Sequence, residues 1–281
     1  MNIKKLACNS IGLFIIIFLF SNKTANGQLV SWLGDRGIIA EIVSDEVPND
    51  KSEVSTAFDY LPTSTTNQLI QHRYFTLSYN EGAEQAEWVA YELKKEYVKS
   101  NDLKRPYFIA DPKVITGSAD WRNYKKSGYD KGHLCPAADM KFDTTAFRET
   151  FYTSNIAPQL PEFNGGIWNR LEQKVRYWAL RYDGVHVVTG GVLKSSVKTI
   201  GMEKVAVPEY FYKIVLDHSN GSYKMIAFLI PNQKSDKSLF NYVVSVDSLE
   251  KRTGIDFFSK LDNQLENDLE RRSDYKSWLL K

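Results

Sequence analysis

The stretch DKGHLCPAADM, residues 130–140, holds the strongest candidates for chemistry in this 281-residue chain. Histidine ordinarily titrates near neutrality, so His133 can take a proton from water at physiological pH. Asp130 is near enough along the chain to influence a ring nitrogen of that histidine. Gly132 and Pro136 flank the histidine and favour a loop or a short strand over a helix. The stretch therefore indicates a general base, with a packed structural histidine as the alternative.

A second group of polar residues follows in TSNIAPQLPEFNGGIWNRLEQKVR, residues 153–176. Asn155 and Asn164 have turn-forming neighbours, and a turn or cap role is the simplest interpretation of each. Asn164 directly precedes an expected helix, so it is either the N-cap of that helix or, through its side-chain carbonyl, a hard oxygen ligand that magnesium accepts. Glu172 and Arg176 are four residues apart on the same helix, where a simple exposed ion pair is the alternative to a site role.

Both stretches resemble the DNA/RNA non-specific endonuclease family, the ββα-metal nucleases that include endonuclease G. Residues 127–140 are similar to the family signature Asp-Arg-Gly-His-x-x-Pro, and residues 153–176 are similar to its second block. The spacings from Asn155 to Asn164, Glu172 and Arg176, in steps of 9, 8 and 4 residues, are those of the family. The likeness runs from about residue 70 to about residue 261. Both blocks at these spacings are a far more specific signal than a short glycine-histidine signature alone.

The resemblance implies a role for each of these residues. His133 is expected to be the general base, and Asn164 the one protein ligand of a magnesium ion, which manganese can replace. Glu172 is expected to orient the waters of the metal, and Asn155 to support the site. Arg176 is expected to face the scissile phosphate. Together these roles imply a metal-dependent hydrolase that cleaves DNA and RNA through contacts with the phosphate backbone, without sequence specificity, and leaves 5′-phosphate ends.

One position of the signature departs from the family, because Lys131 stands where the family has arginine. Lysine keeps the positive charge but lacks the planar fork that binds a phosphate through two hydrogen bonds. Arg105 is a candidate for a second phosphate-binding arginine, although the spacing around it is not a clean match. Three further basic residues are candidates for a local cationic patch, with a solvated charged face as the simpler interpretation: Arg122, Lys125 and Lys126.

Two other functions compete with a metal nuclease. Cys135 and His133 are two residues apart and share one side of an extended chain, so a cysteine-histidine hydrolase is possible. Neighbours on one strand rarely give an aimed nucleophile and an oriented base, and a small buried residue is the simpler interpretation of Cys135. A non-catalytic nucleic-acid-binding module on the same fold is the third function. We interpret the remaining histidines as structural: His72, His186 and His218.

The N-terminal residues predict export. Two lysines precede an apolar run centred on residues 13–20, and small residues follow, which is the layout of a cleaved secretory signal over residues 1–27. Cleavage removes three lysines and no acidic residue, so the formal charge falls from +2 to −1. It also removes Cys8 and leaves a single thiol. We therefore expect a secreted or periplasmic protein without a membrane anchor or internal disulfide, and the sequence does not decide between a monomer and a homodimer.

The rest of the chain indicates a leader at residues 28–65 and one nuclease domain at residues 66–281. Strands and helices mix along the domain, which predicts an α+β fold with a central antiparallel-rich sheet flanked by helices. Strands are expected over residues 73–80, 107–114, 184–192, 204–218 and 222–232. Helices are expected over residues 83–98, 143–152 and 166–182, with a last one beginning at an apparent capping box of Asp247 and Glu250.

Overall fold

A seven-stranded antiparallel sheet forms the centre of the protein. The computed structural model describes residues 61–99, 101–194 and 198–278. In spatial order the strands are β1 (Leu69–Gln71), β2 (Phe75–Asn80), β3 (Gln85–Lys94), β6 (Gly184–Gly191), β9 (Tyr210–Asp217), β10 (Lys224–Pro231) and β11 (Val243–Val244). Two smaller two-stranded sheets consist of β4 (Asp130–His133) with β5 (Ile156–Gln159), and β7 (Thr199–Ile200) with β8 (Val205–Ala206).

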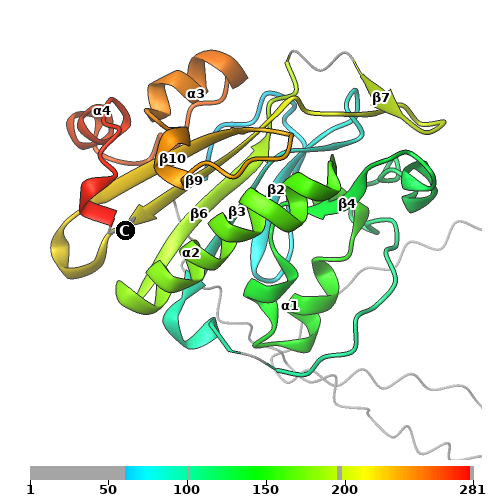
Figure 1. Ribbon diagram of the computed structural model, residues 1–281, viewed down its shortest axis with the longest axis horizontal. Coiled ribbons are helices and arrows are strands. Elements are labelled where there is room, and N and C mark those ends of the chain that lie inside the picture. Colours follow the sequence, from blue (N-terminus) through cyan, green and yellow to red (C-terminus); the bar gives the residue numbers. More distant parts are fainter. Residues whose placement is uncertain (1–60, 100, 195–197, 279–281) are drawn as a thin grey trace, which may run out of the picture. The chain divides into compact units, whose positions relative to one another are not determined.

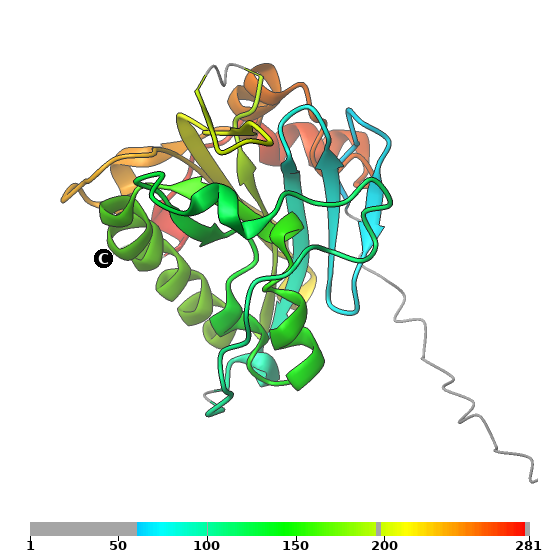
Figure 2. The same ribbon diagram turned by 90° about the vertical axis from the view of Figure 1, so that its right-hand side faces the viewer.

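Helices cover both faces of the large sheet. One face packs against α2 (Asn169–Arg181), and the other packs against α3 (Val246–Thr253) and α4 (Asn263–Glu270). Figures 1 and 2 show α2 beside the sheet and α3 and α4 close together at its other side. The shorter elements are α1 (Thr144–Glu149), η1 (Lys95–Tyr97), η2 (Trp121–Tyr124), η3 (Ala137–Met140), η4 (Thr153–Asn155), the π-helical turn η5 (Phe163–Trp168), η6 (Ser219–Gly221), η7 (Leu239–Tyr242) and η8 (Lys276–Trp278). Helices packed on an antiparallel sheet confirm the α+β prediction.

Strand β3 shows why the helix expected over residues 83–98 was wrong. Successive side chains of a strand point to opposite faces of the sheet. In β3, Val89 and Tyr91 enter the core beneath α2, whereas Trp88 and Ala90 enter the core beneath α3 and α4. Because both faces are buried, apolar residues occupy both, and the alternation that marks a strand disappears from the sequence. The remaining apolar spacing matched a helix by coincidence.

Other sequence predictions can also be compared with the structure. The strand expected over residues 107–114 is wrong, since that segment makes only a single bridge, between Ile109 and Tyr152. The helices near residues 143–152 and 166–182 are present, as are the strands near residues 184–192 and 222–232. The strand expected over residues 204–218 is instead two strands, β8 and β9, which belong to different sheets. The proposed signal peptide and most of the leader are outside the described residues. Within the described part of the chain, no helix is long and apolar enough to cross a membrane.

Candidate active site

The signature stretch forms β4, which pairs with β5 so that His133 is opposite Ile156 and Asp130 is opposite Gln159. After β5 the chain turns through η5 into α2, which gives the order strand, strand, helix. Gly132 lies between Lys131 and His133 of β4, where a Cβ would be only 2.2 Å from Cδ of the Gln159 side chain. The glycine of the signature therefore leaves room for the side chain of Gln159 next to His133.

His133 is held in an aromatic cage. The centroid of its ring is 5.0 Å from that of Phe151 and 5.6 Å from that of Phe108. Its side chain is only partly exposed, and Nε2 is buried without a hydrogen-bond partner among the described residues. Burial lowers the pKa of His133 to about 3, and the positive charge of Arg105 adds to the effect. The imidazole is therefore neutral over the physiological pH range and has a free nitrogen.

Two cations lie close to this cage. The guanidinium carbon of Arg105 is 5.6 Å from the Phe108 ring centroid and 5.3 Å from the Phe151 ring centroid. Nζ of Lys131 is 5.4 Å from the centroid of Phe108. Arg105 and Lys131 thus share an aromatic ring with His133, although Arg105 comes from a segment 28 residues before that histidine. Positive charge is gathered beside the proposed base.

The side-chain amide of Asn155 holds the backbone that follows His133 through hydrogen bonds. Its Oδ1 accepts a hydrogen bond from the backbone N–H of Cys135 at 2.8 Å. Its Nδ2 donates to the backbone carbonyls of Cys135 at 3.0 Å and Thr150 at 2.9 Å. Asn155 is fully buried at the end of η4. Its amide therefore joins the end of β4 to the segment that leads into β5, which is more than the turn role suggested by its neighbours.

Replacement of Asn155 by alanine is expected to lower the free energy of unfolding by about 3 kcal/mol, because three buried backbone groups lose their partner. Urea unfolding at neutral pH measures this value. Asn241→Ala, at an exposed asparagine, is the matched control and should stay within about 0.5 kcal/mol of the wild type. Equal stabilities for the two variants would contradict a stabilising role of the Asn155 hydrogen bonds.

The lowered pKa of His133 predicts a pH-dependent stability. The folded protein binds a proton at this ring less readily than the unfolded chain, whose histidine keeps its ordinary pKa near 6.5. The contribution of the neutral ring is fully present above pH 6.5 and declines as the pH falls towards 3. Between pH 7 and pH 5 the wild type should therefore lose about 1 to 2 kcal/mol more than His133→Gln. Urea unfolding at both pH values measures this difference, and identical pH profiles would contradict it.

The side chain of Asn164 contacts that of Asp130, a residue of β4 that comes three positions before His133. Nδ2 of Asn164 donates to Oδ2 of Asp130 at 3.0 Å. Asn164 belongs to the π-helical turn η5, and Gly166 interrupts the helical backbone (φ −102°, ψ −111°) before α2 begins. Asn164 is therefore not the N-cap of α2. Because the amide nitrogen is committed to Asp130, the side-chain oxygen is the atom that remains for a ligand.

Glu172 and Arg176 take part in a buried charge cluster, so an exposed ion pair is the wrong interpretation. Nη1 of Arg176 is 2.7 Å from Oδ1 of Asp139, which is completely buried. The hydroxyl of Tyr91 donates to the other oxygen of Asp139 at 2.8 Å. Arg176 is thus fixed from α2 to η3, the short helix that directly follows the signature.

Lys213, a fully buried lysine on β9, completes this charge cluster. The four charged residues of the cluster are Asp139, Glu172, Arg176 and Lys213. Nζ of Lys213 is 4.8 Å from the ring centroid of Trp168 and has no hydrogen-bond partner among the described residues. Burial raises the pKa of Glu172 and lowers that of Lys213, while the opposite charge of each residue counteracts the shift of the other. The two acids and two bases of the cluster balance in formal charge.

Comparison with known proteins places this arrangement in a family. Residues 56–264 match the family model described as DNA/RNA non-specific endonuclease. This chain belongs to that family. It is 35% identical over 232 residues to the mitochondrial nuclease EXOG of Xenopus laevis, which covers 76% of this chain and 64% of that protein. It is 33% identical over 205 residues to human mitochondrial endonuclease G, which covers 68% of this chain and 69% of that protein.

A solved structure of the family supports the fold. The crystal structure of the EndoG/EndoGI complex matches with a TM-score of 0.66 and 31% identity, over 70% of this chain and 88% of that chain. Against the human nuclease EXOG, by contrast, the match spans only 55% of the relative's length. The chain thus spans less than two thirds of the length of the EXOG nucleases it matches, and those relatives are named as mitochondrial proteins.

Several residues around the site of this endonuclease-family member were not identified from the sequence. Asp139 was visible within the signature stretch, but its partner Arg176 is 37 residues away. Lys213 had a faint signal, a single charge inside an apolar strand. Phe108 and Phe151 gave none, because aromatic residues are common throughout the chain. Each of these residues reaches the site only through contacts between distant segments.

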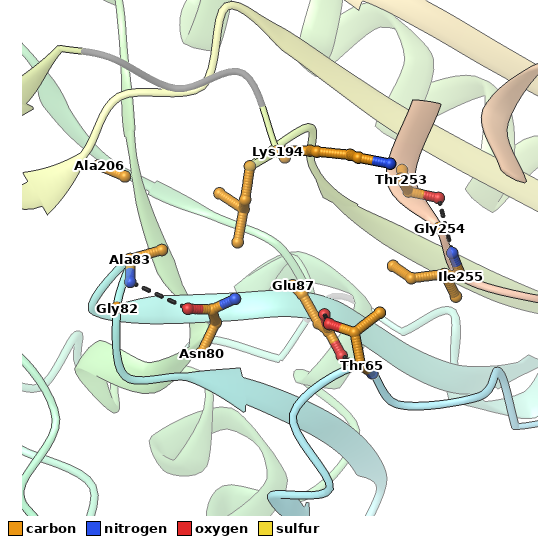
Figure 3. Close-up of a pocket in the computed structure, with 12 residues that line it drawn as sticks. Thr65, Asn80, Gly82, Ala83, Glu87, Lys194, Ala206, Thr253, Gly254 and Ile255 are labelled. Atoms are coloured by element: carbon orange, nitrogen blue, oxygen red, sulfur yellow. Dashed lines mark hydrogen bonds between the residues drawn. The ribbon is translucent and has the colours of Figure 1, made fainter. Parts of the chain in front are cut away.

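One pocket of the structure lies away from the residues of this endonuclease-family signature. It has a volume of about 470 Å³ and is lined by residues including Glu87, Lys194 and Thr253 (Figure 3). Glu87 is engaged there by Thr65 and Ser78. None of the signature residues lines this pocket. A polynucleotide needs an open surface rather than an enclosed cavity, so the geometry around His133 is the better guide to function.

The other histidines lie elsewhere in this endonuclease-family fold. Nε2 of His72 is 2.8 Å from Oδ2 of Asp111, and both side chains are buried. His186 and His218 stack with ring centroids 4.7 Å apart. None of these three contacts His133 or Asn164 through a hydrogen bond or ring contact that the described residues show. These contacts agree with the structural roles expected from the sequence.

Proposed function

We propose that this protein is a metal-dependent endonuclease that hydrolyses phosphodiester bonds in DNA and RNA without sequence specificity. The observation that carries the proposal is the position of His133 and Asn164 in one strand-strand-helix unit. His133 ends β4, and Asn164 is bonded to Asp130 on the same strand. A neutral base and a hard oxygen ligand are thus built on the two short strands and the turn that follows them. The nuclease names of the relatives support the same activity.

His133 acts in this proposal as the general base that takes a proton from the attacking water. Its neutral imidazole can accept a proton, and its buried Nε2 has no competing partner among the described residues. Phe108 and Phe151 fix the plane of the ring. A phosphodiester bound nearby brings negative charge, which raises the pKa of the imidazole and makes it a stronger base.

The donor set around Asn164 fits a magnesium ion that keeps most of its water. Asn164 would hold the ion through its side-chain oxygen, with Asp130 fixing the orientation of the amide. A single neutral ligand suits magnesium, which dehydrates reluctantly, and manganese can replace it. When bound, the ion supplies positive charge that stabilises the leaving oxygen. Glu172 orients the waters around the ion in this proposal.

The basic residues bind the substrate through its phosphates. Lys131 and Arg105 both lie over Phe108, beside His133. Asp139 holds Nη1 of Arg176, which leaves the other donors of that guanidinium for a phosphate oxygen. Contacts of this type position the backbone and read no bases, so cleavage should be insensitive to sequence and weakened by salt.

Incubation of the purified protein with plasmid DNA and with RNA tests this function. With magnesium we expect both substrates to be degraded without discrete fragments, and with a chelator we expect neither to be cut. The products should carry 5′-phosphates, which a ligase can join directly. Absence of cleavage with both magnesium and manganese would refute the proposal. Binding of both polymers without cleavage would favour the non-catalytic nucleic-acid-binding module instead.

The cysteine-histidine hydrolase is disfavoured by the surroundings of Cys135. The thiol is completely buried, and burial, together with the charge of Asp139, raises its pKa well above the ordinary value. The reactive thiolate is therefore not available at neutral pH. Thiol-blocking reagents should leave the nuclease activity unchanged. Loss of activity on thiol modification, with no effect of chelation, would favour the hydrolase.

We also propose that the chain is exported, although the named EXOG and endonuclease G relatives are mitochondrial proteins. Residues 1–27 contain a continuous apolar run and no arginine. Mitochondrial presequences are instead amphipathic and rich in arginine. N-terminal sequencing of the protein isolated from its source tests the proposal. A mature chain that begins at Gln28 supports export, whereas a chain that keeps the apolar run would contradict signal cleavage.

A further inference from the structure

Three carboxylates meet between α3 and α4, at the side of the sheet opposite to α2. One oxygen from each of Asp247, Glu250 and Glu270 can be chosen so that all three atoms are within 4.8 Å of one another. Figure 1 shows the two helices side by side. Such proximity of like charges is unfavourable unless a cation or protons neutralise them.

The fold fixes these three residues in place. Asp247 and Glu250 are three residues apart near the start of α3, so they share one face of that helix. Glu270 is the last residue of α4. Leu249 and Leu269, which neighbour two of the carboxylates in sequence, are buried in the common core beneath both helices. The packing of both helices therefore fixes the backbone positions from which the three carboxylates project.

The capping box expected at the start of α3 is wrong. Asp247 and Glu250 therefore do not cap this helix. The N-cap is Ser245, which makes no side-chain cap hydrogen bond, and the helix begins at Val246. Oε1 of Glu250 instead accepts a hydrogen bond from the backbone N–H of Phe257 at 3.0 Å. Its other oxygen remains for a ligand.

The burial of Glu270 is a second, independent observation. The residue is only 6% exposed, yet Oε1 has no hydrogen-bond partner among the described residues. Oε1 of the neighbouring Glu266 is buried without a partner as well. Within the described residues, no lysine, arginine or histidine forms an ion pair with any of the three carboxylates. A buried carboxylate without a partner is costly, and a cation directed at it would remove that cost.

We propose that Asp247, Glu250 and Glu270 form a calcium site that ties α3 to α4. Calcium takes six to eight oxygen ligands at about 2.3 to 2.6 Å, so ligands on opposite sides of the ion are up to about 5 Å apart. The mutual distances of the three oxygens, all within 4.8 Å, lie inside that span. Magnesium binds at about 2.0 to 2.1 Å and seldom uses an all-protein cage of carboxylates. The site is separate from Asn164, which is on the other side of the sheet with α2.

Calcium titration of the full chain by calorimetry tests the site. The protein should carry Asn164→Ala, so that the proposed magnesium ligand is removed. We expect one calcium ion per chain, and loss of that binding when Glu270→Gln is added. Glu270→Gln keeps the shape of the side chain, and Asp247→Asn serves as a second variant if the first folds poorly. Glu96→Gln, at an exposed glutamate, is the matched control and should bind calcium normally.

Thermal unfolding gives an independent readout. At calcium about 100-fold above the Kd, Tm should rise by roughly 5 °C in the wild type and in Glu96→Gln, and not in Glu270→Gln. Magnesium at the same concentration should produce a smaller rise. Glu270→Gln should retain magnesium-dependent cleavage, because it lies outside the proposed active site. Absence of calcium binding in the wild type, or equal binding after Glu270→Gln and Asp247→Asn, would overturn the proposal.

Discussion

His133→Ala is expected to lower kcat/KM for plasmid cleavage by about 10³-fold, because a positioned general base contributes about 10²- to 10⁴-fold to such a reaction. The loss should appear mainly in kcat, since the imidazole acts on the attacking water rather than on the binding of the polymer. Binding of DNA to the variant should be close to that of the wild type. Cleavage assays with saturating magnesium, together with a filter-binding assay, separate the two quantities.

The control for this prediction is His218→Ala, at an exposed histidine that stacks with His186 far from β4 in the fold. It should cleave plasmid at the wild-type rate. Circular dichroism should show that both variants are folded. Equal cleavage by His133→Ala and the wild type would contradict the role of the base. A parallel loss in His218→Ala would show that the first effect was not specific to the site.

The residues proposed for the active site could be picked out in the sequence because they lie in two short blocks that resemble the nuclease family. Their residues are joined by local geometry: β4 carries Asp130 and His133, and the turn after β5 returns Asn164 to Asp130. The roles of these residues stay predictions until variants are measured.

The parts that could not be predicted depend on contacts between distant segments. β3 pairs with β2 and β6, and burial on both faces hides its strand pattern. Lys213 comes from the centre of the sheet to balance Glu172, 41 residues before it. Arg105 reaches the cage of His133 along a segment without regular structure. No local pattern of residues predicts such long-range contacts, since they depend on how the whole sheet packs.

Asn164→Asp is expected to lower cleavage at limiting magnesium by about 10²-fold, even though aspartate is a common magnesium ligand. The reason is Asp130, whose Oδ2 is 3.0 Å from the amide nitrogen of Asn164. A carboxylate at position 164 would face another carboxylate and lose the donor that orients it. Two carboxylates this close cannot both ionise easily, so one of them would keep a proton at neutral pH.

The reciprocal exchange distinguishes this explanation from a simple loss of the ligand. In the double variant Asp130→Asn with Asn164→Asp, an amide again donates to a carboxylate, and only one negative charge remains. The double variant should therefore cleave within about 10-fold of the wild type and better than Asn164→Asp alone. Magnesium titration of the cleavage rate measures the apparent affinity for each variant. If the effects of the two single substitutions simply multiply, Asp130 does not orient Asn164, and the hydrogen bond between them has no part in holding the metal.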